Sequence, residues 1–134
     1  MEGASRGAAA AGGHVIGVTA PAVFASRSTA NEYVAEEIMA PSLPKRIDVM
    51  LEMAAASIAL EGNIGTLTEI MVAWNVAFVS RFSDAVRKPV VAVGATWRQL
   101  IPELAESLVT DGSLVTIVDT ADEAVAEVRA ALQS

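Results

Sequence analysis

Short apolar runs of strand-forming residues alternate with longer segments of helical periodicity, and this alternation restricts the possible folds more than any other feature. Four such runs are present, at residues 14–19, 57–60, 89–93 and 114–118. They are rich in Val, Ile and Ala and lack the polar alternation of half-exposed strands, so each is predicted to be a strand buried on both faces. Strands separated by helices form parallel sheets with helical crossovers. The sequence therefore predicts an α/β protein with a Rossmann-like three-layer fold.

Helices are expected between these strands, at residues 1–11, 47–55, 65–81, 97–109 and 121–132. Gly12–Gly13 are suited to end the first helix, and Pro44 is suited to open the second. Asp119 or Thr120 is expected to cap the last helix, with Glu123 in its first turn. Residues 20–27 are expected to form a loop. The stretch 30–40 is ambiguous, with a possible short strand at 37–39.

Length and composition indicate one domain, 1–134, because 53% of the 134 residues are hydrophobic and can form a core. The net charge of −7 disfavours a nucleic-acid partner, since an acidic surface repels phosphate backbones. The absence of cysteine excludes disulfides and thiolate metal sites, and neither a metal nor a cofactor is expected. No apolar run has transmembrane length, and the opening MEGASRGAAAAGG is a poor signal peptide. No membrane partner and a cytoplasmic location are expected.

The stretch 56–69, ASIALEGNIGTLTE, carries the pattern most suggestive of a binding site. A predicted strand runs through a glycine turn into a helix, whose first backbone N–H groups lack partners and carry the positive end of the helix dipole. Glycines permit close backbone approach, and Thr66 adds a hydroxyl. The turn Gly62, Asn63, Ile64, Gly65 and Thr66 is therefore a candidate phosphate site. The alternative is an ordinary strand-to-helix turn in which the glycines only shape the chain.

The same stretch resembles the PGGxGTxxE motif of the LOG family, the "lysine decarboxylase-like" proteins that act as cytokinin-nucleotide phosphoribohydrolases. Gly62, Gly65, Thr66 and Glu69 stand in register with this motif. The family's M-x-x-R-K-x-x-M helix is matched at Arg46 and Met50. Further segments are similar to family segments: GGHVIGVT at 12–19, AWN at 73–75, KPVVAVG at 88–94 and TIVDTADEAV at 116–125.

The resemblance implies hydrolysis of the N-glycosidic bond of an AMP-like nucleoside 5′-monophosphate, in a site completed across a homodimer. It implies catalytic roles for Glu69, which would stabilise charge on the ribose or orient water, and for Arg46, which would position Glu69 or bind substrate. More simply, Glu69 is a dipole partner for its helix and Arg46 a solvated surface residue. Two other functions stay open: a non-catalytic nucleotide-binding or sensing protein, and a carrier similar to molybdenum-cofactor carriers.

Three positions depart from the family motifs. Glu61 and Asn63 stand where the family has proline and glycine, and Ile47 replaces a lysine. The Glu61 carboxylate is expected at the rim of the phosphate site, where it would weaken binding unless its side chain points away. Lys45 is a partial substitute for the lost lysine. Asn63 is expected to be tolerated in the turn.

The chain begins late relative to the family, since residues 1–3 resemble the end of its GGGxxGxMG loop. The family's first strand, first helix and second strand are therefore expected to be missing, which would leave strand 14–19 to pair with another strand or a second chain. Trp74 is expected in the core or a dimer interface rather than stacked on a base.

Overall fold

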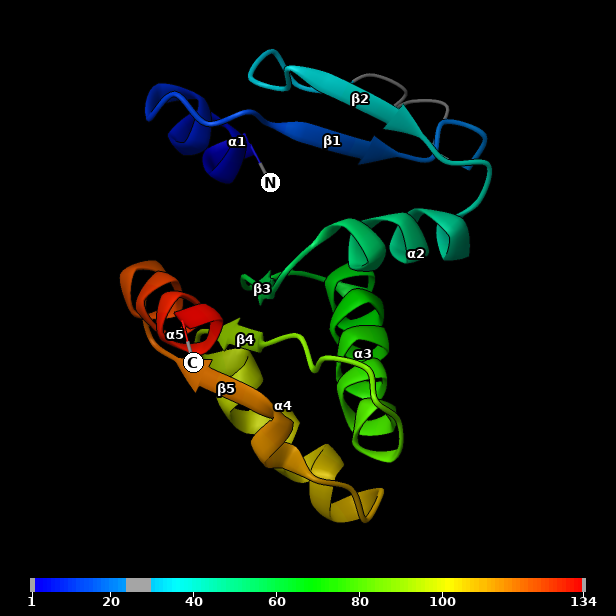
Figure 1. The fold of residues 1–134 in the computed structure, drawn as a ribbon, viewed down its shortest axis with the longest axis vertical. Coiled ribbons are helices and arrows are strands. Elements are labelled where there is room, and N and C mark those ends of the chain that lie inside the picture. The colour runs from blue at the N-terminus through cyan, green and yellow to red at the C-terminus, as the bar shows by residue number, and fades with distance from the viewer. Residues whose placement is uncertain (1, 24–29, 134) are drawn as a thin grey trace. The chain divides into compact units, whose positions relative to one another are not determined.

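The computed structural model describes residues 2–23 and 30–133, and the chain divides into two compact units, Met1–Met53 and Ala54–Ser134 (Figure 1). Each unit has its own parallel sheet, ordered β1-β2 in the first and β3-β4-β5 in the second. Helices alternate with parallel strands in both units, so the predicted α/β, Rossmann-like class is confirmed. Within the described ranges, no helix combines the length and the apolarity that a membrane span needs.

The first unit consists of two helices and two strands: α1 (Glu2–Ala10), β1 (Ile16–Thr19), β2 (Glu36–Met39) and α2 (Leu43–Met53). β1 pairs directly with β2, from Ile16 opposite Glu36 to Thr19 opposite Met39. The strand predicted at 14–19 and the possible strand at 37–39 are thus both present. Of the loop expected at 20–27, residues 24–27 lie outside the described part of the chain.

The start of α2 follows the predicted chemistry. The backbone N–H of Lys45 donates to the Ser42 hydroxyl at 3.3 Å, which caps the first turn. Pro44 lies in that turn, where a missing backbone N–H removes no helical hydrogen bond. Ile47 then points inward and is only 8% exposed. The helix therefore begins four residues before the predicted 47, because the proline and the serine cap extend it at its start.

The second unit alternates strands and helices in the predicted order. Its elements are β3 (Ser57–Ala59), α3 (Ile64–Val79), β4 (Val90–Val93), α4 (Ala95–Ser107), β5 (Val115–Val118) and α5 (Ala121–Gln133), with short 3-10 turns at Ser80–Phe82 and Gly112–Leu114. β4 lies in the middle of the sheet and all four of its residues are buried. The uninterrupted apolar run at 90–93 is explained by this central position.

One part of the core of the second unit forms where α5 packs on the sheet, and buried residues of α3 and α4 form the rest. Val91 and Val93 of β4 share a face with Val118 of β5 and contact Ala124 of α5. Trp97 of α4 is 1% exposed, and its indole N–H donates to the Leu60 carbonyl at 3.1 Å. A buried tryptophan needs such a partner for its N–H group. This bond ties the start of α4 to the end of β3.

All three strands of this sheet run in parallel, so their carboxyl ends meet at one edge. The turns β3–α3, β4–α4 and β5–α5 lie at this carboxyl edge, at residues 60–63, 94 and 119–120. The opposite, amino edge is where the chain enters each strand. Ligands of open α/β sheets bind at the carboxyl edge.

Candidate functional site

The β3–α3 turn is shaped by Asn63, which caps α3. Asn63 has an extended backbone (φ −104°), and its Oδ1 accepts the Gly65 N–H at 3.0 Å. This is the usual geometry of an asparagine N-cap. The cap starts the helix at Ile64, one residue before the predicted 65. It also uses one of the backbone donors that the phosphate interpretation assigns to the turn.

Gly62 is required by a close approach rather than by an unusual backbone angle. The positive-φ glycines of the described chain are Gly12 and Gly94, so Gly62 and Gly65 adopt ordinary angles. A Cβ atom added at Gly62 would overlap the hydroxyl and Cβ of Thr66. The Thr66 side chain therefore lies directly over the Gly62 backbone, and a larger residue at 62 would displace it.

The start of α3 leaves backbone donors available. Among residues 2–23 and 30–133, no acceptor pairs with the backbone N–H of Ile64 or of Thr66. These N–H groups lie at the positive end of a 16-residue helix. Together with the adjacent Thr66 hydroxyl, they form an arrangement that can bind an anionic group.

Glu61 belongs to the β3–α3 turn, but its carboxylate lies at the start of α4. Its Oε1 accepts hydrogen bonds from the Thr96 N–H at 3.3 Å and from the Thr96 hydroxyl at 3.4 Å. The side chain passes over Gly94, where an added Cβ would come within 2.6 Å of the Glu61 Cγ. The carboxylate thus interacts with the positive end of α4. It leaves the donors of Ile64 and Thr66 uncovered.

Glu69 and Arg46 lie in different units, and each is placed within its own. Glu69 is half-buried in the second turn of α3, on the helix that the candidate turn begins. Arg46 is half-buried in α2, where its Nε donates to the Val18 carbonyl at 2.7 Å. This bond fixes the guanidinium at the carboxyl end of β1. The contact with Val18 shows that Arg46 is not simply a solvated surface residue.

Lys45, the predicted partial substitute for the lysine that is lost at Ile47, is paired within its own helix. Ile47 is a core residue of the first unit, whereas the Lys45 ammonium is paired with Asp48 at 2.6 Å. The hydrogen bond from Lys45 to Asp48, and the charge of that carboxylate, raise the pKa of the Lys45 ammonium. Its charge is used locally on α2.

The β4–α4 turn is a part of the carboxyl edge that the motif analysis did not single out. Gly94 has φ +111° and ψ 173°, a conformation that only glycine adopts without strain, and it leads directly into α4. Thr96 supplies donors beside it. The sequence does contain an indication of the β4–α4 turn, because a glycine stands between an apolar strand and a helix, as it does at Gly62.

The β5–α5 turn is closed by its own side chains. The Thr120 hydroxyl accepts the Glu123 N–H at 3.2 Å, and the Glu123 carboxylate accepts the N–H groups of Asp119 and Thr120 at 2.9 and 3.1 Å. This reciprocal capping box confirms Thr120 as the cap and places the negative charge of Glu123 at the start of α5. That charge makes the β5–α5 turn a poorer place for an anion than the β3–α3 turn.

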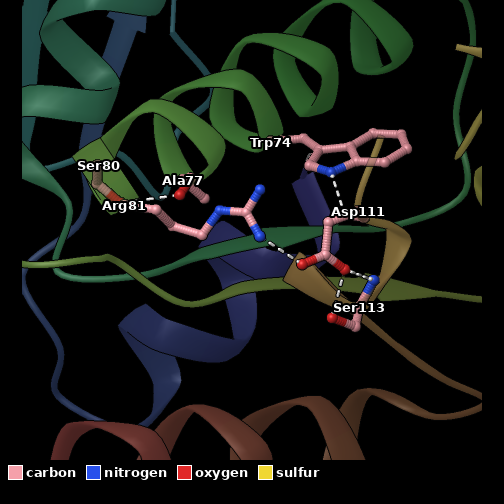
Figure 2. Close-up of polar contacts among 6 residues, drawn as sticks. All are labelled: Trp74, Ala77, Ser80, Arg81, Asp111 and Ser113. Carbon is pink, nitrogen blue, oxygen red and sulfur yellow. Dashed lines mark hydrogen bonds and ion pairs between the residues drawn. The ribbon is translucent and has the colours of Figure 1, made fainter. Parts of the chain in front are cut away.

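The amino edge is built around Asp111 (Figure 2). Its Oδ1 accepts the N–H and hydroxyl of Ser113, and its Oδ2 is paired with Arg81 at 2.7 Å. The Asp111 carbonyl accepts the indole N–H of Trp74 at 2.9 Å. The Ser113 hydrogen bonds, and then the charge of Arg81, lower the pKa of Asp111. Trp74 is a buried residue held in the core, as one of its two predicted roles requires.

Comparison with known proteins supports the motif analysis. A search of curated proteins gave no match. The protein-family model described as "Possible lysine decarboxylase" matches residues 1–132, nearly the whole chain. That span includes α2 with Arg46, the β3–α3 turn and Glu69. The chain therefore belongs to this lysine decarboxylase-like family, the LOG family that its motifs resemble.

Proposed function

We propose that the protein hydrolyses the N-glycosidic bond of a nucleoside 5′-monophosphate and releases the free base and ribose 5-phosphate. The observation that carries this proposal is the start of α3, where the N–H groups of Ile64 and Thr66 have no acceptor among residues 2–23 and 30–133. Membership of the LOG family gives these donors a ligand class, a nucleotide phosphate.

The phosphate would lie against the start of α3. The Ile64 and Thr66 N–H groups and the Thr66 hydroxyl would donate to its oxygens, while the helix dipole favours its charge. Because Gly62 has no side chain, the Thr66 side chain can lie directly over its backbone at the start of the helix. Asn63 would act through the backbone, as the cap that sets the direction of the first helical turn, and Gly65 would contribute a peptide without a side chain that could obstruct the ligand.

Glu69 and Arg46 would act on the ribose. As the C1′–N bond breaks, positive charge develops on the ribose ring, and a carboxylate at Glu69 would stabilise this charge or orient the attacking water. Water adds to C1′, and the base leaves with a proton. Arg46 would bind a substrate oxygen through its fork of N–H donors. We further propose that the active species is a homodimer, which sedimentation analysis would test by showing twice the chain mass.

Adenine release from AMP by the purified protein, followed by chromatography, tests the hydrolase proposal. We expect turnover by the wild type and a loss of about 10²-fold or more in Glu69→Ala and in Arg46→Ala, because each would remove a charge used in the transition state. Glu103→Gln is the matched control, since Glu103 is exposed on α4 away from the turn. No release by the wild type, or equal rates in all the variants, would contradict the proposal.

A specific observation favours a second function, nucleotide binding without catalysis. The Asn63 side chain uses the Gly65 N–H, so the turn has one donor fewer than a glycine at 63 would leave it. A binding or sensing protein would show a higher melting temperature with AMP and no adenine release. Loss of that stabilisation in Gly62→Ala would locate the ligand at the turn, because the added Cβ displaces Thr66.

A further inference from the structure

Glu61 carries a fixed negative charge next to the proposed phosphate position. It precedes Gly62 in the chain, and its carboxylate is held beyond the turn by the backbone and side-chain donors of Thr96. Two hydrogen bonds and the contact with Gly94 keep it there. The carboxylate leaves the α3 donors uncovered and lies at the start of α4, the next helix along this edge.

The β3–α3 turn and the start of α4 lie next to each other at the carboxyl edge, because β3 and β4 are adjacent strands. The Glu61 side chain runs from this turn to Thr96 and Gly94 at the start of α4. A second phosphoryl group that extended from the first toward α4 would therefore meet the Glu61 carboxylate. One helix further, the β5–α5 turn is closed by Glu123. Glutamate carboxylates therefore lie at the starts of both α4 and α5 along this edge.

We propose that Glu61 is a specificity-determining residue, which restricts the ligand of the β3–α3 turn to one terminal phosphate group. Its carboxylate fills the neighbouring space and repels the additional charge of a diphosphate. A monophosphate ends at the α3 donors and avoids this conflict. The inference rests on the proposed function, because it assumes that a nucleotide phosphate binds at the start of α3.

Binding of AMP and ADP to the purified wild type, Glu61→Gln and Glu61→Ala, measured by calorimetry, tests the inference. Glu61→Gln keeps an oxygen acceptor for Thr96 and removes the charge, and Glu61→Ala also opens the space. We expect the affinity for ADP relative to AMP to rise about tenfold or more in Glu61→Gln, and further in Glu61→Ala. Glu103→Gln removes the same charge from a distant, exposed site on α4 and should leave the ratio unchanged.

The outcomes separate this inference from the proposed function. Wild type that binds AMP, with the same ADP-to-AMP ratio in all the variants, would overturn the role of Glu61 alone. A wild type that binds neither nucleotide would overturn the proposed function, and the inference with it, even if Glu61→Gln gained ADP binding. No binding of either nucleotide to any variant would overturn both. Because the readout is a ratio of two affinities, a general loss of stability would not imitate the expected result.

Discussion

At the amino edge of the β3–β4–β5 sheet, Asp111 has both carboxylate oxygens bound by neighbours in the chain, by Ser113 and by Arg81 (Figure 2). At the carboxyl edge, Glu61 reaches across to Thr96 and leaves the donors of the adjacent turn uncovered. The amino edge is thus a closed structural cluster, whereas the carboxyl edge combines glycine turns with available N–H groups. The comparison shows that the charged side chains of the amino edge are used within the fold, whereas the carboxyl edge keeps backbone donors available at the start of α3.

We expect the largest effect from a substitution at Gly94. Because Gly94 has no side chain, the Glu61 side chain can reach across the carboxyl edge. Gly94→Ala would place a side chain at φ +111° and within 2.6 Å of the Glu61 Cγ and Oε1 atoms. We expect a loss of about 3 kcal/mol in the free energy of unfolding, from backbone strain plus steric overlap. Urea denaturation measures this loss.

The double variant Gly94→Ala with Glu61→Ala separates the two causes of that loss. Removing the Glu61 carboxylate relieves the overlap but not the strained backbone, so the double variant should be more stable than the sum of the two single effects. Strict additivity would show that Glu61 does not lie over Gly94. An undisturbed Gly94→Ala variant would contradict the assigned backbone conformation.

The open and closed turns of the carboxyl edge are compared directly by Asn63→Ala and Thr120→Ala. Each variant removes a helix cap, so each should lose about 1 kcal/mol of unfolding free energy, measured in urea. Only Asn63→Ala also frees a donor at the phosphate turn, the Gly65 N–H. We therefore expect AMP to bind more tightly to Asn63→Ala and with unchanged affinity to Thr120→Ala. Equal changes in affinity would remove the distinction between the turns.

The amino edge contains one strained residue, Val109, whose replacement should stabilise the protein. Val109 has φ +53° and is 92% exposed, at the end of α4. The Thr110 N–H bonds the Ala105 carbonyl at 2.9 Å and the Val109 N–H bonds the Glu106 carbonyl at 3.2 Å, which is a Schellman motif with valine where glycine is usual.

We expect Val109→Gly to gain about 0.5–1 kcal/mol, because relief of the left-handed strain exceeds the larger entropy of glycine in the unfolded chain. Val109→Ala is the control, since alanine keeps a Cβ at the same angle and should gain little. Thermal and urea unfolding of the three proteins would measure both differences. Equal stabilities of the glycine and alanine variants would show that the backbone angle is not strained.

The alternation of strands and helices could be predicted because the strand runs are apolar and the helices carry recognisable starts. The prediction that all four runs are buried on both faces was wrong for β1 and β3, which are partly exposed, and holds for β4. The glycine turn could also be predicted from its motif, and Thr120 from capping chemistry. The position of the Glu61 carboxylate could not, because it depends on Gly94 and Thr96, which are more than thirty residues away in the chain. The sequence also could not decide whether Lys45 pairs with Asp48, as it does, or serves the candidate site. Local patterns predict backbone elements, whereas long side chains select among partners that only the fold brings together.

The contacts of Asp111 at the amino edge should make the stability of the protein depend on pH, and this is the smallest effect that we predict. The Ser113 hydrogen bonds are the largest cause of the lowered pKa of Asp111, and Arg81 adds a smaller one. A carboxyl whose pKa is lowered by folding stabilises the protein fully above its ordinary pKa and loses this contribution as pH falls through the lowered value. The stability of the wild type should therefore decline below about pH 4 through this group, and Asp111→Asn should flatten that decline. Arg81→Gln should keep most of it, because the Ser113 donors remain; urea midpoints measured at successive pH values would show whether Arg81 or Ser113 dominates.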